Sequence, residues 1–255
     1  MTTHAARNAI PGPIPTTLDV IELRDFGAGY DGTPVLGGID LAVRQGEVLA
    51  LLGRNGAGKS TLVNGLLNLG PTVQGRVVVR GRDVSGWAPH RIVRLGIAIV
   101  PQGRGIFGNL SVADNLRMAR FGAARNATRN GWTLERVYDR YPKLGQRRSV
   151  AAGALSGGER QLLAMSRALL TQADILILDE PTEGLAPMIV EEVIADNIRA
   201  LRKEGVTVVL VEQNIALALA LADETVVLSE GRIAFRGSAG TLRGREDIQN
   251  EHLGV

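Results

Sequence analysis

The chain is 255 residues long, enough for one large domain or two small ones. Its content of 45% hydrophobic and 22% charged residues is ordinary for a globular protein and excludes a disordered chain, a collagen and a coiled coil. The formal net charge of +3 is too small to select a class of partner. Because the chain has no cysteine, it cannot form a disulfide, a thiolate metal site or a thiol nucleophile.

Residues 1–17 hold three prolines and many small residues, so we expect a mobile N-terminal tail there and a single domain over residues 18–255. No apolar run approaches the roughly 20 residues that span a bilayer. The N-terminus also lacks an apolar segment of signal-peptide length. These features predict a cytoplasmic protein.

The first half of the chain alternates strands with one helix. Apolar alternation predicts strands over residues 18–23 and 38–43, followed by a turn at Gln45 and Gly46. Residues 48–52 are continuously apolar, which is typical of a strand buried on both faces. A glycine-rich loop, a helix over residues 58–68 and strands over residues 74–80 and 96–100 follow.

Residues from about 103 to 155 differ from the rest, because they form a mostly helical insertion, which a further helix follows. Helical patterns cover residues 112–121, 134–141 and 157–170. The remaining chain alternates again, with strands at 175–178, 206–211, 225–228 and 232–235 and helices at 188–203 and 215–222. This alternation predicts an α/β fold with a parallel sheet and helices on both of its faces.

The loop after residues 48–52 matches the phosphate-binding pattern G-x-x-x-x-G-K-[ST] in full. Its glycines let successive backbone N–H groups point at a phosphate, and the next helix turns its positive end toward the same anion. A lysine in this position reaches the β- and γ-phosphates, and the following hydroxyl ligates Mg²⁺. The sequence therefore predicts an ATP and Mg²⁺ site, with these residues binding the nucleotide: Gly53, Asn55, Gly56, Ala57, Gly58, Lys59, Ser60 and Thr61.

Two carboxylates, Asp179 and Glu180, end the strand at residues 175–178. Ligands of a parallel sheet bind at the carboxyl ends of its strands, so Asp179 is predicted to hold Mg²⁺ beside the phosphate loop. Glu180 is predicted to act as the general base that polarises the attacking water.

A second candidate anion site lies at Ser156-Gly157-Gly158-Glu159. Ser156 is a candidate N-cap, and the two glycines leave backbone N–H groups uncovered at a helix start. With this segment in view, the sequence resembles the ATP-binding cassette (ABC) ATPases over residues 18–238, because Leu155 to Gln161 reads as the signature motif of that family.

The resemblance implies a P-loop cassette with a parallel RecA-like core, an N-terminal antiparallel β-subdomain and a helical subdomain over about 103–171. It also implies a head-to-tail dimer in which the signature of one chain closes on the ATP of the other. Gln102 matches the glutamine that contacts Mg²⁺ and water, and Tyr30 matches the aromatic residue that stacks on adenine. Two positions differ from the family: Gln213 stands where a histidine is usual, and Ala186 where an aspartate is usual. A glutamine donates a hydrogen bond but cannot shuttle a proton, so Glu180 remains the better candidate for the general base.

Local strings resemble the ATPases of branched-chain amino acid importers and of the related urea and amide importers. They include residues 101–107, 180–187 and 211–214. A resemblance to such importers implies three kinds of partner: two permease chains, an extracytoplasmic binding protein, and either a second, different ATPase chain or a second copy of this one. It places this chain on the cytoplasmic face of the membrane and implies no nucleic acid partner. Residues 105 and 108–109 depart from the bulkier or charged residues expected on the permease side.

Two other functions stay open from the residues. One is a soluble ABC ATPase acting on nucleic acid or the ribosome, although such proteins usually have two cassettes in one chain. The other is a nucleotide-binding regulator that does not hydrolyse ATP, against which the intact Glu180 argues. Arginines in or after the helical insertion form either a docking surface or a solvated face: Arg125, Arg129, Arg147 and Arg148.

Overall fold

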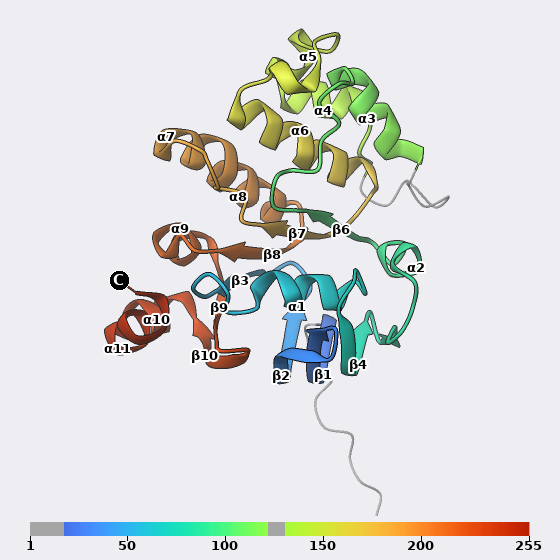
Figure 1. Cartoon of the computed structure of the whole chain (residues 1–255). Helices are drawn as coiled ribbons and strands as arrows, with labels where there is room; N and C mark the ends of the chain where they lie inside the picture. Colours follow the sequence, from blue (N-terminus) through green and yellow to red (C-terminus); the bar gives the residue numbers. More distant parts are fainter. Residues whose placement is uncertain (1–17, 122–130, 255) are drawn as a thin grey trace, which may run out of the picture.

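The computed structural model describes residues 18–121 and 131–254, which form two sheets and their covering helices (Figure 1). One sheet has four strands in the order β2-β1-β4-β5, and the other has six strands in the order β10-β9-β3-β8-β7-β6. The expected α/β cassette with an N-terminal antiparallel sheet is confirmed. The predicted tail and the arginines Arg125 and Arg129 lie outside the described residues.

The antiparallel sheet is dominated by a long hairpin of β1(Asp19–Tyr30) and β2(Thr33–Arg44). Both strands run well past the alternating stretches at residues 18–23 and 38–43, because register shifts between Leu23 and Gly29 absorb the breaks in alternation. The sheet continues with β4(Thr72–Val79), which was predicted at residues 74–80, and with the short β5(Arg82–Asp83), which was not predicted.

The six-stranded sheet is parallel except at one edge. Its parallel strands are β3(Val48–Leu52), β6(Ile97–Val100), β7(Ile175–Asp179), β8(Thr207–Glu212) and β9(Glu224–Ser229). The edge strand β10(Arg232–Ser238) runs antiparallel to β9. The predicted parallel core is confirmed, and β10 is antiparallel because the two residues that connect it to β9 permit only a hairpin.

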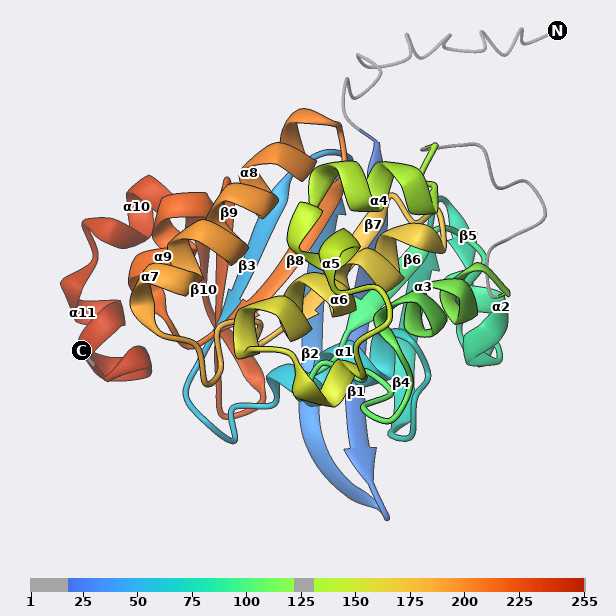
Figure 2. The same cartoon turned by 90° about the horizontal axis from the view of Figure 1, so that it is seen from above.

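Side chains of the parallel strands alternate between two cores. Val48, Leu176 and Leu210 face the core that contains the helical subdomain, whereas Leu49 and Ile177 face the antiparallel sheet. The helix α1(Lys59–Leu66) packs on this second face, beside the β1–β2 hairpin (Figures 1 and 2). Helices therefore fill one face of the core sheet, while the other face is shared between α1 and the antiparallel sheet.

The helical subdomain covers the first face. After α2(Pro89–Val93) and β6, it consists of α3(Val112–Phe121), α4(Leu134–Arg140), α5(Pro142–Gln146), the short 3-10 turn η1(Ala152–Ala154) and α6(Gly157–Leu170). It shares a hydrophobic core with the sheet, and polar contacts add to this: Glu204 pairs with both Arg136 and Arg140, at 2.7 and 2.6 Å, and the buried Tyr141 hydroxyl donates to Asn197 Oδ1 at 2.7 Å.

The last part of the chain surrounds the β9 edge. The predicted helix at 188–203 is present as α7(Pro187–Ile189), the π-helical turn η2(Val190–Ala195) and α8(Asp196–Lys203), and α9(Ile215–Leu221) follows β8. The elements α10(Ala239–Arg243), α11(Glu246–Ile248) and η3(Gln249–Leu253) were not predicted. Among the described residues, no helix has the length and apolar character needed to cross a membrane.

Candidate functional site

The predicted phosphate loop links β3 to α1, and its conformation depends on glycine. Gly56 and Gly58 have φ values of +81° and +104°, in the left-handed region that favours glycine. A Cβ on Gly53 would lie 2.5 Å from the Leu228 carbonyl oxygen. Gly58 is also the N-cap of α1 and supplies no side chain to the helix start, so the first N–H groups of α1 remain available to an anion.

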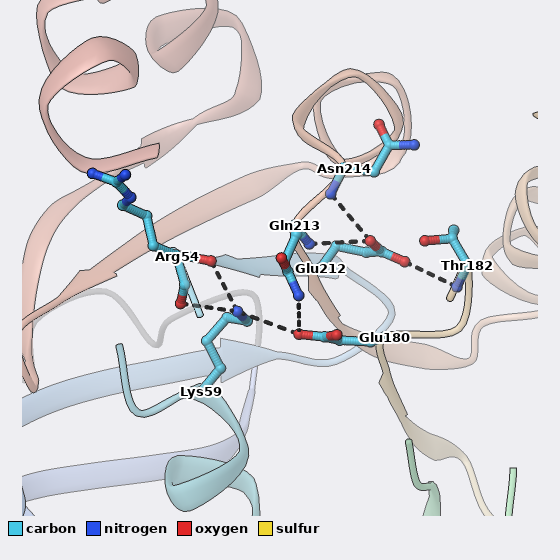
Figure 3. A network of polar contacts seen from close by, with 8 residues as sticks. Arg54, Lys59, Glu180, Thr182, Glu212, Gln213 and Asn214 are labelled. Atoms are coloured by element: carbon cyan, nitrogen blue, oxygen red, sulfur yellow. Dashed lines mark hydrogen bonds and ion pairs between the residues drawn. The ribbon is translucent and has the colours of Figure 1, made fainter. Parts of the chain in front are cut away.

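Lys59 is almost fully buried, with 5% of its surface exposed, and its ammonium group lies inside the loop. Nζ donates to the Gly53 carbonyl oxygen at 2.8 Å and to that of Arg54 at 3.3 Å (Figure 3). It also lies 3.4 Å from Glu180 Oε1, which joins the phosphate loop to the end of β7. The structure therefore brings together the two residues that the sequence placed at the phosphates and at the attacking water.

Asp179 ends β7 beside this pair and is buried, with 7% of its surface exposed. Burial, followed by the negative charge of Glu180, raises the pKa of Asp179, while the Ser60 hydroxyl and the Lys59 charge act in the opposite direction. Its Oδ1 atom is buried without a hydrogen-bond partner. An unpartnered carboxylate oxygen next to a serine hydroxyl fits a hard divalent cation such as Mg²⁺.

Glu180 and Gln213 lie side by side at the ends of β7 and β8. Gln213 Nε2 donates to Glu180 Oε1 at 2.8 Å (Figure 3). Glu180 has a φ of +48°, unusual for a residue with a side chain, and its backbone N–H donates to the Val211 carbonyl oxygen at 2.9 Å. Neighbouring parallel strands thus supply the carboxylate and the amide that the sequence predicted for this site.

Glu212, which the sequence analysis did not single out, is the buried carboxylate behind this pair. It is 1% exposed and accepts hydrogen bonds from the backbone N–H groups of Thr182, Gln213 and Asn214. Burial raises its pKa, and hydrogen bonds from the Thr182 side chain and from these backbone N–H groups oppose the rise. In the sequence, Glu212 could have been noticed as a charged residue at the end of the otherwise apolar stretch at residues 206–211.

Gln102 follows β6 and has an exposed side chain, and its backbone N–H lowers the pKa of Asp179. Two residues on, Arg104 has a φ of +71° and was also missed by the sequence analysis. Its Nε donates to Gln161 Oε1 at 3.2 Å and its Nη2 to the Glu183 carbonyl oxygen at 2.9 Å. Arg104 therefore links the loop after β6 to both α6 and the turn after β7.

The predicted signature segment begins α6, and its N-cap is confirmed. Glu159 N–H donates to Ser156 Oγ at 3.3 Å, and Ser156 N–H donates to Glu159 Oε2 at 2.9 Å, forming a complete capping box. The glycines also permit close packing, because a Cβ on Gly158 would lie 2.8 Å from Ile189 Cγ2. Since α6 packs on the face of the core sheet opposite to α1, the structure does not place this segment beside the phosphate loop.

The remaining predicted residues lie nearby or on the surface. Tyr30 ends β1 with 41% of its surface exposed, and Ala186 lies at the start of α7. Arg147 pairs with Glu159 at 3.1 Å, and the Arg148 guanidinium lies over the Tyr138 ring. Stacking by Tyr30 and docking by these arginines stay predictions.

Three comparisons with known proteins bear on this geometry. The family model described as "ABC transporter" matches residues 36–183. The chain is 38% identical to the high-affinity branched-chain amino acid transport ATP-binding protein BraG of Pseudomonas aeruginosa, over 88% of this chain and 95% of that protein. It is 37% identical to the probable branched-chain amino acid transport ATP-binding protein LivF of Archaeoglobus fulgidus, over 89% and 96%.

Solved structures agree on the fold. The ADP conformation of MJ1267, an ATP-binding cassette of an ABC transporter, is 26% identical with a TM-score of 0.74, covering 92% of this chain and 94% of that one. CbiO1 from Clostridium perfringens, part of the ABC transporter complex cbiONQ, is 26% identical with the same TM-score, covering 91% and 95%.

Proposed function

Because the chain belongs to the ABC transporter family of ATP-binding proteins, we propose that it hydrolyses ATP to drive a membrane importer of branched-chain or other hydrophobic amino acids. The observation that carries this proposal is the identity of 38% and 37% to two branched-chain amino acid transport ATP-binding proteins, over nearly the full length of both. The chain is an ABC-type ATPase and binds nucleotide. The proposal concerns the solute that is transported and the chains that form the importer.

In the proposed site, the N–H groups of the phosphate loop and of the α1 N-terminus bind the phosphates. Lys59 exchanges its carbonyl contacts for phosphate oxygens, at the cost of part of its contact with Glu180. Tyr30 stacks on the adenine. Asp179 and Ser60, with Gln102 nearby, would hold Mg²⁺, which supplies positive charge to the phosphates when bound.

Glu180 accepts the proton of the attacking water, because it is the carboxylate that pairs with Lys59 and therefore lies beside the phosphates. Gln213 orients this carboxylate by donating to its Oε1 atom. As a neutral amide, Gln213 supplies a hydrogen bond and no proton, which leaves the acid–base role to Glu180.

The proposed active form is a head-to-tail dimer, with a second ATPase chain or a second copy of this one. The packing of α1 and α6 on opposite faces of the core sheet supports this arrangement, since Ser156 to Glu159 of the same chain lies away from its own phosphate loop. In the dimer, that segment meets the nucleotide of the partner. Two permease chains and an extracytoplasmic binding protein complete the importer, and this chain lies on the cytoplasmic face of the membrane.

Uptake by a reconstituted importer tests the proposal. The chain is purified with its cognate permeases, inserted into liposomes containing Mg-ATP and supplied with the binding protein, and uptake of labelled leucine and of labelled urea is followed. We expect ATP-dependent leucine uptake that is lost with Glu180→Gln. Urea uptake without leucine uptake would support a urea importer instead, and robust ATP hydrolysis with no association with any permease would contradict a transport role.

A further inference from the structure

Glu212 lies at the carboxyl end of β8, in register with Leu52, the last residue before the phosphate loop. Its side chain is 1% exposed, in a position where a buried carboxylate is costly unless it is well hydrogen-bonded. The roles assigned above to Lys59, Asp179, Glu180 and Gln213 leave this carboxylate without a function.

The carboxylate joins two loops that leave neighbouring strands (Figure 3). Oε1 accepts from the backbone N–H of Thr182, in the turn after β7, at 3.2 Å. Oε2 accepts from the backbone N–H groups of Gln213 and Asn214, in the loop after β8, at 3.1 and 3.2 Å. One rigid group therefore fixes the spacing of both loops.

Each of these loops carries one member of the hydrolytic pair. Glu180 lies two residues before Thr182, and Gln213 is itself held by Glu212 through its backbone. The two side chains meet at 2.8 Å, between Gln213 Nε2 and Glu180 Oε1. The left-handed φ of Glu180, +48°, needs surrounding contacts to hold it, and the Thr182 hydrogen bond is one of them.

A carboxylate suits this position better than any neutral side chain. Three backbone N–H donors and the Thr182 hydroxyl converge on two oxygens, and a carboxylate accepts at both oxygens without offering a donor. An amide would turn an NH₂ group toward at least one backbone N–H and leave that N–H unsatisfied. The chemistry of the site thus selects an acceptor-only group.

We propose that Glu212 is a positioning residue for ATP hydrolysis, which sets the geometry of the Glu180–Gln213 pair through the backbones of the loops after β7 and β8. The inference rests on the hydrolytic roles proposed for Glu180 and Gln213. The hydrogen bonds of Glu212 run to these two loops and not to the phosphate loop, so its loss lowers the rate of hydrolysis without lowering the affinity for ATP.

The test compares Glu212→Ala and Glu212→Gln with Glu47→Gln. Glu47 is a matched control, because it is also a buried carboxylate bound to a backbone N–H, that of Arg44 at 2.6 Å, but it lies before β3 at the opposite end of the sheet from the phosphate loop. Hydrogen exchange of the intact chain, followed peptide by peptide, reports on the loops. Steady-state hydrolysis and Mg-ATP titration of the assembled ATPase report on kcat and affinity.

For Glu212→Ala we expect faster exchange in the peptides that contain the amides of Thr182, Gln213 and Asn214, because these amides lose their acceptor. We also expect kcat to fall by about tenfold to a hundredfold, as for displacements near 1 Å in an active site. The dissociation constant for Mg-ATP stays within about twofold of the wild-type value in this account. Glu212→Gln, which keeps one oxygen for the Gln213 side, falls between wild type and Glu212→Ala, and Glu47→Gln keeps the wild-type kcat.

Unchanged exchange at these amides in Glu212→Ala would overturn the inference, and so would a kcat equal to that of the wild type. Parallel losses of kcat and ATP affinity would do the same, because they would indicate general damage to the site. Since hydrogen exchange needs no nucleotide chemistry, it separates a failure of this inference from a failure of the roles proposed for Glu180 and Gln213.

Discussion

Replacing Lys59 by alanine removes the one buried ammonium group at the phosphate loop of the described chain. Two unit charges about 4 Å apart interact by about 4 kcal/mol at an effective dielectric constant of about 20, which corresponds to roughly a thousandfold in affinity. Part of this attraction between Lys59 and a phosphate is offset, because Lys59 lies 3.4 Å from Glu180 and its interaction with that carboxylate weakens when the phosphate binds. We therefore expect Lys59→Ala to weaken Mg-ATP binding by about a hundredfold or more.

The same substitution leaves the carbonyl oxygens of Gly53 and Arg54 without this donor. Such a loss costs about 1–3 kcal/mol of stability, so the melting temperature should fall by a few degrees while the chain remains folded. Calorimetric titration with Mg-ATP measures the affinity, and thermal unfolding monitors the fold. Lys143→Ala is the control, since Lys143 is exposed and pairs only loosely with Glu192, at 3.8 Å, and it should bind Mg-ATP as the wild type does.

Near-normal binding by folded Lys59→Ala, within about threefold of Lys143→Ala, would refute the assignment of the phosphate loop. A lysine that contacts the phosphates cannot be removed at so small a loss of affinity, because the attraction between its charge and theirs disappears with it.

Two further predictions concern stability. Tyr141→Phe removes the buried hydroxyl that donates to Asn197 at 2.7 Å, and should lower the free energy of unfolding in urea by about 1–3 kcal/mol; no measurable change would argue against this link between the helical subdomain and α8. Burial raises the pKa of Glu47 above its usual 4.5, so the native state binds this proton more tightly than the unfolded state, and the contribution of Glu47 to stability is lost as the pH rises from about 4.5 through its native pKa. Glu47→Gln lacks this loss, so its stability relative to wild type should increase as the pH rises above about 4.5 in urea titrations, and a relative decrease with rising pH would contradict the reasoning.

Several elements were predictable because local and tertiary preferences agree. The bounds of β3 match the continuously apolar residues 48–52, and those of α6 match the helix opened by the S-x-x-E capping box at Ser156. The phosphate loop and the Asp179–Glu180 pair were identifiable because each follows a buried strand, which fixes where its side chains lie.

Other features depend on packing that one segment does not reveal. The helices α10 and α11 are 5 and 3 residues long, too short for a periodic pattern, and form only against the rest of the fold. The β1–β2 hairpin continues through bulges that break the alternation. Glu212 and Arg104 act through backbone groups of distant loops, Thr182 and Glu183, which no spacing in the sequence brings together.

The central claim is that ATP bound at the phosphate loop is hydrolysed with Glu180 as the general base. The most direct measurement is single-turnover hydrolysis by Glu180→Gln in the assembled importer, with Mg-ATP affinity measured on the same preparation. The account predicts an affinity close to that of the wild type and a rate lower by about a hundredfold or more. A rate within about threefold of wild type at full ATP occupancy would contradict it, because the proton of the attacking water would then have another acceptor.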